Sequence, residues 1–320
     1  MVVEYISIFI FSCLLLFYAG KWVVESLAGI ARFLELREFV VAFFVVAIAG
    51  AVPNLFVGIS SALRGIPQLS FGDIVGGNLF DLTIAVGLAA FISKGISAKS
   101  KTIQTSSIFT MIVAILPLLL ILDGVLGRGD GIILILGFIS YTFWLFSKRE
   151  RFTKVYDIKE KKVSFLKRFK KFSKDLGKVV LGLFLLLIAA QGIVISASFF
   201  AEHFDLPLGL VGVLIVAVGN CLPETYFIII AAKSSQNWMI LGDLMGSVII
   251  TSTLVLGIVA LICPIEVLDF SPFAIGRFFL VISAIFFLFF MRSDKKITQK
   301  EAFILFSLYF LFVFCQLLFR

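Results

Sequence analysis

The sequence predicts an all-α polytopic membrane protein whose ten transmembrane helices form two inverted-topology repeats of five helices each. Hydrophobic residues make up 61% of the 320 residues, charged residues make up 15%, and the mean hydropathy is +1.12. Soluble domains do not have this composition. Apolar runs of bilayer-spanning length, about 17–25 residues, recur along the whole chain. A pair of motifs also recurs, so that Pro53 reappears as Pro223, 170 positions later.

The apolar runs are separated by short polar segments, and no stretch is left that could form a soluble domain. The expected spans are residues 3–30, 39–63, 71–92, 104–122, 130–147, 179–202, 207–232, 239–262, 271–291 and 301–318. The start of the first run contains an acidic residue, Glu4, and lacks both a basic segment and a clear cleavage site. We therefore expect a retained first span and not a signal peptide.

The net charge of +8 is concentrated in one segment, because 148–178 holds thirteen of the 28 lysines and arginines. With ten spans, the positive-inside rule places this segment in the cytoplasm and both termini outside. A nucleic-acid or regulatory patch is an alternative, but an anchor on anionic lipid is favoured. The expected parts are a first repeat at 1–147, a basic cytoplasmic loop at 148–178 and a second repeat at 179–320.

The internal repeat is carried by polar and helix-breaking residues as well as by shared apolar ones. The motif at 45–87 aligns without a gap on the motif at 215–257. The shift places Pro53 on Pro223, Asn54 on Glu224, Gly72-Asp73 on Gly242-Asp243, Gly76 on Gly246 and Asp81 on Thr251. Each copy covers a pair of spans, and three spans lie between the pairs. The copies therefore cross the membrane in opposite directions, which is typical of secondary transporters.

The second copy combines a broken helix with a buried acid. From Leu206 to Ala232, Glu224 is the one charged residue, and Pro223 directly precedes it. Glycine and proline at this depth, with Gly50 and Pro53 in the first copy, free carbonyl oxygens that a cation can satisfy. An acid in the membrane interior indicates a functional site. The pattern predicts half of a cation site in each copy.

These residues resemble the sodium/calcium exchangers of the cation/calcium antiporter superfamily, whose repeats carry a G-[TS]-S-x-P-E helix break and a G-N-x-x-G-S-N helix. The second repeat reads Gly219-Asn220-Cys221-Leu222-Pro223-Glu224 and then Gly242-Asp243-Leu244-Met245-Gly246-Ser247. The first reads Ala49-Gly50-Ala51-Val52-Pro53-Asn54 and then Gly72-Asp73-Ile74-Val75-Gly76-Gly77-Asn78. The resemblance covers essentially the whole chain and implies the exchanger fold and exchange of Ca²⁺ for Na⁺.

The departures from the family pattern fall on the ion site. Asn54 stands where the family has Glu, Asp81 stands where Asn is common, and Thr251 stands where Asp is common. Asp81 and Glu224 would then neutralise one Ca²⁺, two Na⁺ or two protons. Ca²⁺ takes 6–8 oxygens at about 2.3–2.6 Å. The expected remaining ligands are Asn54, Asn78, Ser247, Thr251 and backbone carbonyls near Gly50 and Asn220.

Three residues keep two interpretations. Asp73 and Asp243 either cap helix N-termini, which we favour, or form a second shell or vestibule for cations. Cys221 either packs as a small residue at a helix crossing, which we favour, or binds a soft metal such as Cd²⁺ or Zn²⁺.

The expected function is a secondary active cation antiporter and not an enzyme, because no nucleophile–base pair, nucleotide loop or HExxH motif is present. The alternatives are a proton-coupled exporter of Ca²⁺ or another divalent cation, and a structural or regulatory homologue that has lost transport. We expect no permanently bound cofactor. The expected partners are inorganic cations and lipid, without nucleic acid, in a prokaryotic plasma membrane. The sequence sets no oligomeric state and is compatible with a monomer.

Overall fold

The computed structural model describes residues 2–33, 48–147, 165–233, 237–267 and 271–318, and nearly all of them are helical. The first half contains α1 (Val2–Phe33), α3 (Ile48–Leu63), α4 (Pro67–Phe80), α5 (Val86–Ile92), α6 (Lys101–Leu120) and α7 (Arg128–Ser147). The second half contains α8 (Phe165–His203), α9 (Leu208–Val211), α10 (Ala217–Asn220), α11 (Leu222–Lys233), α12 (Asn237–Ile250), α13 (Leu256–Ile262), α14 (Ser271–Ser293) and α15 (Gln299–Leu318). Three π-helical turns, η2 (Asp81–Ala85), η5 (Gly212–Val216) and η6 (Thr251–Val255), and the 3-10 turn η3 (Ile121–Asp123) connect some of these helices. The strands are β1 (Ile96–Ser97), β2 (Val125–Leu126), β3 (Ile265–Glu266) and β4 (Lys296–Ile297).

Eight stretches of the described residues are long and apolar enough to cross a bilayer. They are Val2–Val23, Pro67–Ile92, Lys101–Asp123, Arg128–Leu145, Phe172–His203, Met239–Ile262, Phe273–Ser293 and Gln299–Leu318. A bent helix pair from Leu208 to Lys233 is a ninth candidate. The expected span 39–63 corresponds to α3, whose stretch Gly50–Leu63 is a shorter apolar helix, and residues 39–47 lie outside the described part. The chain is therefore an integral membrane protein with many spans, and the number ten stays a prediction.

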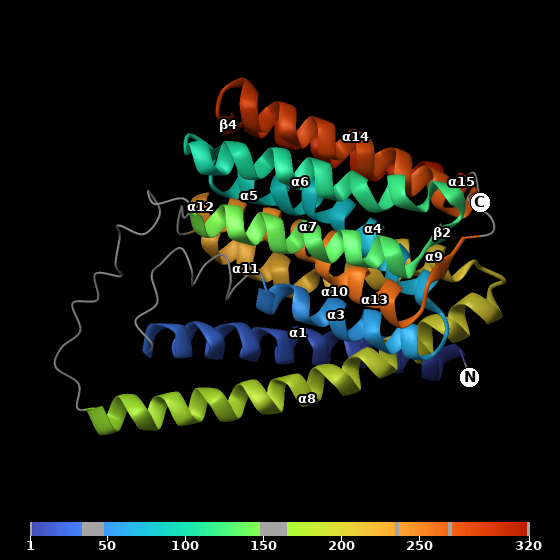
Figure 1. Cartoon of the computed structure of the whole chain (residues 1–320), viewed down its shortest axis with the longest axis horizontal. Helices are drawn as coiled ribbons and strands as arrows, with labels where there is room; N and C mark the ends of the chain where they lie inside the picture. Colours follow the sequence, from blue (N-terminus) through green and yellow to red (C-terminus); the bar gives the residue numbers. More distant parts are fainter. Residues whose placement is uncertain (1, 34–47, 148–164, 234–236, 268–270, 319–320) are drawn as a thin grey trace.

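The helices form an elongated bundle in which α1 packs along α8 on one side, while α6 and α14 lie on the opposite side (Figure 1). The start of α1 and the end of α15 lie at one end of the bundle, and α8 begins at the other end (Figure 1). That beginning, at Phe165, makes the C-terminal part of the basic segment 148–178 helical. The first part of the segment, 148–164, lies outside the described residues.

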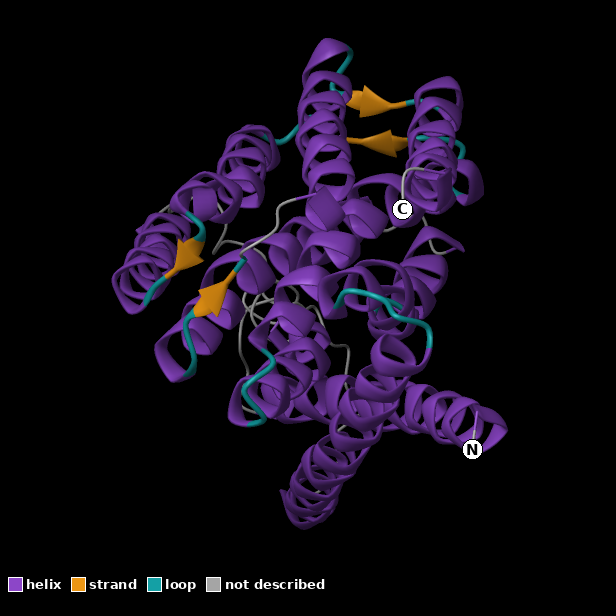
Figure 2. Cartoon of the chain, turned by 90° about the vertical axis from the view of Figure 1, so that its right-hand side faces the viewer, coloured by secondary structure: helices purple, strands orange, loops and turns teal. Residues whose placement is uncertain are grey.

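Corresponding elements of the two halves have matching bounds. Shifting α4, η2 and α5 by 170 residues gives the bounds of α12, η6 and α13. Within one residue, β1 corresponds in the same way to β3, and β2 to β4. The strands pair between halves, β1 with β4 and β2 with β3, both antiparallel. Viewed along the bundle, the two pairs are separate ribbons at its periphery (Figure 2).

The core is built around the four elements that carry the repeated motifs. The spans Pro67–Ile92 and Met239–Ile262 are 83% and 78% buried, whereas Val2–Val23 is 22% buried. Helices enclosed by protein on nearly all sides can carry polar side chains, because those side chains meet other protein groups and not lipid. The peripheral helices expose apolar side chains, as a lipid-facing surface requires.

Small residues bring α4 close to the second helix break. A Cβ atom on Gly72 would overlap the carbonyl oxygen of Gly209, and one on Gly212 would lie 2.5 Å from the carbonyl oxygen of Leu69. Glycine is therefore needed where the backbones of α4, α9 and η5 cross. This crossing places α4 against α10, the helix that ends at the break.

Candidate cation-binding site

The predicted break near Pro223 is confirmed. Helix α10 ends at Asn220, Cys221 forms a turn, and α11 begins at Leu222. The segments before and after the turn differ in direction by 42°. Because Pro223 has no N–H, it cannot satisfy the carbonyl of Gly219 in the usual helical way. Glu224 follows in the first turn of α11, beside the free end of the broken helix.

An interruption of the helix near Pro53 was also expected, and in the described stretch this prediction is wrong. Residues Ile48–Leu63 form one α-helix that contains Pro53. The neighbouring helix α1 crosses both prolines closely, since a Cβ on Gly20 would lie 3.7 Å from the ring carbons of Pro53 and Pro223. Because α1 contacts both prolines alike, this contact does not distinguish the continuous helix from the broken one. In α3 the N–H that would bond the carbonyl of Ala49 is missing.

Two buried carboxylates from different halves meet at one hydroxyl. The Ser247 Oγ atom lies 3.2 Å from Asp81 Oδ2 and 2.9 Å from Glu224 Oε1. Their exposed fractions are 2% for Asp81, 3% for Glu224 and 2% for Ser247. A hydroxyl donates one proton and can therefore serve one of the two carboxylates at a time. Two ionised acids so close together in the protein interior need a cation or a proton between them.

A thiol completes this group. The Sγ atom of Cys221 and carboxylate oxygens of Asp81 and Glu224 all lie within 4.8 Å of one another. On the other side, a Cβ on Gly50 would lie 3.4 Å from Glu224 Oε1. Gly50 therefore lines the Glu224 side chain from α3, and its missing side chain leaves room there.

Asn78 and Thr251, two of the expected ligands, are bonded to each other. Thr251 Oγ1 donates to Asn78 Oδ1 at 2.8 Å, and it also lies 2.9 Å from the carbonyl oxygen of Ser247. The amide nitrogen of Asn78 donates to Ser252 Oγ at 2.7 Å. Asp81 and Thr251 are the first residues of the π-helical turns η2 and η6. Such turns shift side chains out of the α-helical register and are frequent at functional sites.

The interpretation of Asp73 and Asp243 as helix caps is wrong. Helix α4 begins at Pro67 and α12 begins at Asn237, so both acids lie well inside their helices. Each is buried, with 1% and 2% exposure. Asp73 Oδ2 accepts a hydrogen bond of 2.8 Å from the amide of Asn220. The two acids therefore lie in the core, and Asp73 is connected directly to the helix break.

Several oxygens around these residues have no hydrogen-bond partner in the part of the chain that the structure describes. They are Asn54 Oδ1, Asp81 Oδ1, Asn220 Oδ1 and Asp243 Oδ2. Buried polar atoms are nearly always paired, so unpaired ones indicate a bound ion or water. All four belong to the residues that the sequence assigned to the ion site or its surroundings.

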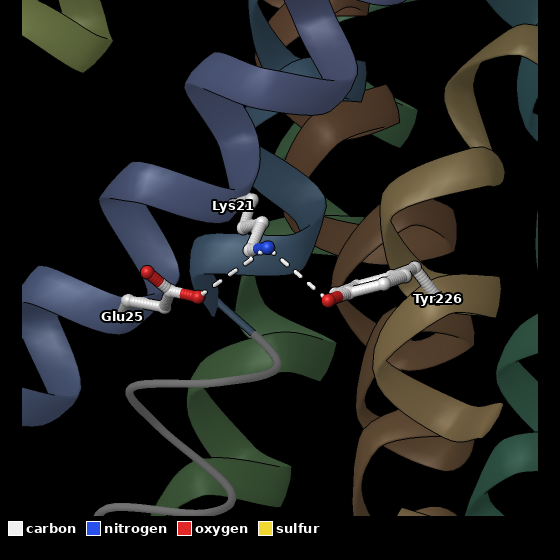
Figure 3. A network of polar contacts seen from close by, with 3 residues as sticks. All are labelled: Lys21, Glu25 and Tyr226. Carbon is white, nitrogen blue, oxygen red and sulfur yellow. Dashed lines mark hydrogen bonds and ion pairs between the residues drawn. The ribbon is translucent and has the colours of Figure 1, made fainter. Parts of the chain in front are cut away.

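No lysine or arginine among the described residues forms an ion pair with the four buried acids. On α1, the charged residue Lys21 follows Gly20, which faces Pro223. The side chain of Lys21 is 31% exposed. Its Nζ donates to Tyr226 Oη at 3.1 Å and lies 3.9 Å from Glu25 (Figure 3). Within the described ranges the acids therefore have no basic partner, and cations or protons are one means of neutralising such buried charges.

Comparison with known proteins decides the family. The family model described as "Sodium/calcium exchanger protein" matches residues 4–147 and again 175–318. The chain belongs to this family. Members of the sodium/calcium exchanger family are antiporters and not enzymes, so the predicted class of protein is confirmed.

Similar proteins are found among archaea and bacteria. The sodium/calcium exchanger MaX1 of Methanosarcina acetivorans is 25% identical, over 92% of this chain and 93% of its own length. The putative antiporter CaxA of Alkalimonas amylolytica is 26% identical over 82% of both chains. A solved structure of the sodium-calcium exchanger NCX_Mj has a TM-score of 0.69 at 24% identity, with 98% of each chain covered. This likeness supports the exchanger fold.

The sequence identified most of the residues that the structure brings together around Asp81, Glu224 and Ser247. It missed Ser252, because a serine in an apolar helix gives no signal of its partner. The favoured packing role for Cys221 agrees with its burial against Gly77 of α4, and the structure adds that the thiol also lies beside the two carboxylates. The position of Cys221 two residues before Pro223, within the break, was the available signal.

Proposed function

We propose that this chain exchanges Ca²⁺ for Na⁺ by alternating access at a site whose charges are Asp81 and Glu224. The observation that carries the proposal is the buried Ser247 hydroxyl within hydrogen-bond distance of both carboxylates. Two negative charges match one Ca²⁺ or two Na⁺, so the simplest cycle is electroneutral. The carboxylates come from opposite halves of the chain, and relative movement of the halves would therefore change the site.

Neutral oxygens complete the proposed ion shell. Ca²⁺ requires about 6–8 oxygens, more than two carboxylates supply. The additional ligands in this proposal are Asn54, Asn78, Ser247, Thr251 and backbone carbonyls near Gly50 and Asn220. The unpartnered Oδ1 atom of Asn54 supports this set, and Asn220, whose backbone carbonyl is included, also has an unpartnered side-chain oxygen. Asp73 and Asp243 would lie outside it and attract cations toward the site.

The proposed architecture has ten spans in two inverted repeats. Three observations support it: the matched bounds of α4–α5 and α12–α13, the reciprocal pairing of β1 with β4 and β2 with β3, and two matches to one family model in a single chain. Residues 1–147 and 179–320 would be the repeats. Inverted repeats give inward-open and outward-open states by exchanging the conformations of two similar halves.

The proposed orientation has both termini outside and the basic segment 148–178 in the cytoplasm of a prokaryote. The ends of α1 and α15 that carry the termini lie at the same end of the bundle, opposite the start of α8 (Figure 1). The basic residues of the segment supply the charge asymmetry.

A proton-coupled antiporter is the second candidate, because the site region holds four buried carboxylates and one Ca²⁺ needs two. Asp243, which has an unpartnered Oδ2, could carry a proton during the return step. The same residues would then exchange Ca²⁺ for H⁺.

Radioactive Ca²⁺ uptake into proteoliposomes tests the proposal and separates the candidates. An outward Na⁺ gradient at equal pH should drive uptake if Na⁺ is the coupling ion. A pH gradient without Na⁺ should drive it if protons are. If neither gradient drives Ca²⁺ accumulation by the purified protein, the proposed function is wrong.

A further inference from the structure

The helix break contains a soft ligand that Ca²⁺ exchange does not use. Cys221 is 2% exposed, and its Sγ lies 3.8 Å from the carbonyl oxygen of Gly77. It also lies within 4.8 Å of carboxylate oxygens of Asp81 and Glu224. Calcium prefers oxygen, whereas thiolate ligands favour thiophilic ions such as Zn²⁺ and Cd²⁺.

The thiol lies beside a position at which the first half lacks a hydroxyl. The counterpart of Ser247 in the first half is Gly77, 170 residues earlier. Ser247 offers its hydroxyl to both acids, and Gly77 has no side chain to do the same. A Cβ on Gly77 would lie 3.6 Å from the Cys221 sulfur. The site is therefore asymmetric, with a hydroxyl oxygen on one side and a sulfur on the other.

A second observation indicates that this group faces a ligand. Asp81 Oδ1 is buried and has no hydrogen-bond partner among the described residues, although Oδ2 is near Ser247. One sulfur and two carboxylates are three protein ligands, and zinc sites with three protein ligands keep a fourth position open for water or another ligand. In a tetrahedral zinc site, sulfur and oxygen ligands are about 3.6 Å apart. The three ligand atoms lie within 4.8 Å of one another and would approach that spacing when a metal binds.

We propose that Cys221, Asp81 and Glu224 bind a thiophilic divalent cation of the Zn²⁺ and Cd²⁺ class, and that the antiporter carries such ions as well as Ca²⁺. The inference rests on the proposed function, because it uses the same site and extends its substrates. On binding, a metal–sulfur bond forms and the S–H bond breaks. The proton leaves for solvent, and no oxidation or reduction occurs.

The first measurement is direct binding of Cd²⁺ to purified protein. A cadmium–thiolate bond gives an ultraviolet sulfur-to-metal charge-transfer absorption, which Ca²⁺ and carboxylates do not give. We expect this band in the parent protein and in Cys263→Ser, a control at the half-buried end of α13. We expect it to be absent from Cys221→Ser, which keeps the size of the side chain. No band in the parent, or an equal band in Cys221→Ser, overturns the inference.

The second measurement is transport selectivity in proteoliposomes, with Cd²⁺ and Ca²⁺ uptake compared within each variant. Loss of a residue that merely supports a metal ligand costs about 10–100-fold in affinity, so loss of the ligand should lower the Cd²⁺-to-Ca²⁺ ratio by at least about tenfold. An unchanged ratio in Cys221→Ser contradicts Cd²⁺ transport through the thiol site. If the band is present but no variant transports Ca²⁺ under any gradient, the proposed exchange function fails while the metal site stands.

Discussion

Glu224 and Asp73 offer a matched pair of substitutions that tests the assignment of the two charges. Both acids are buried, and in each case the amide replacement keeps the shape of the side chain. Glu224 shares Ser247 with Asp81, whereas Asp73 accepts its hydrogen bond from Asn220. In the proposed site, Glu224→Gln removes half of the charge that would neutralise Ca²⁺. Asp73→Asn removes a charge whose partner is a neutral protein amide.

The expected magnitudes differ accordingly. Removing one partner of a buried, hydrogen-bonded charge pair costs about 2–5 kcal/mol. At about 1.4 kcal/mol per tenfold, Glu224→Gln should weaken Ca²⁺ by about 30-fold to several thousandfold. In Asp73→Asn, the new amide oxygen can still accept from Asn220, so the loss should be about 1 kcal/mol of stability, with Ca²⁺ affinity changed less than about threefold.

The assay is the Ca²⁺ concentration dependence of Na⁺-driven uptake in proteoliposomes, normalised to the amount of reconstituted protein. Ca²⁺/Ca²⁺ exchange without Na⁺ serves as an internal reference for binding. Elution of each variant as a single species checks folding. If Glu224→Gln keeps its Ca²⁺ affinity, or if Asp73→Asn loses as much as Glu224→Gln, the two-carboxylate site is refuted.

Three further predictions follow from the same contacts. Asp81→Asn should reduce Ca²⁺ transport strongly, and adding Asn54→Glu should restore part of it, because the second charge is then supplied from α3. If uptake by the double variant is no better than by Asp81→Asn, positions 54 and 81 do not share a cation. Asp243→Asn should alter the dependence of uptake on Na⁺ or pH while Ca²⁺/Ca²⁺ exchange continues, because its unpartnered oxygen lies outside the Ser247 bridge; identical Na⁺ and pH profiles would contradict this. Gly72→Val should destabilise the protein by about 1–3 kcal/mol or more, because the new Cβ would overlap the Gly209 carbonyl. The control Gly137→Ala should not lower the melting temperature, because a Cβ at that position meets no atom within 4 Å.

The repeated motif could be read from the sequence because proline, glycine and aspartate have positional meanings that apolar residues lack. Pro223 predicted the break at Cys221 correctly, since a missing N–H acts locally. Pro53 shows the limit of this reasoning, because the same missing N–H lies inside the continuous helix Ile48–Leu63. A proline therefore weakens a helix at its position without dictating that the helix breaks there.

The start of α4 at Pro67 explains why the capping interpretation of Asp73 failed. Proline is favoured in the first turn of a helix, so Ile66-Pro67 was a start signal that competed with Gly72-Asp73. Hydrogen-bond partners between helices were harder to predict. The pairing of Asn78 with Ser252 depends on the rotation of two helices and on the π-helical turn η6. A single sequence does not reveal that shift of register.

The two halves share a backbone pattern but divide the chemistry between them, and this division bears on mechanism. At each of two equivalent positions, one half has the charge and the other has a neutral oxygen: Glu224 against Asn54, and Asp81 against Thr251. The two charges therefore come from different halves, and both approach Ser247. A cation bound between them connects the halves, whereas an empty site leaves two like charges that repel each other. Movement of one half against the other should thus be favoured when both acids are neutralised by a cation or by protons and opposed when they are bare. Such a dependence is what obligatory exchange requires, because the empty carrier must not change state.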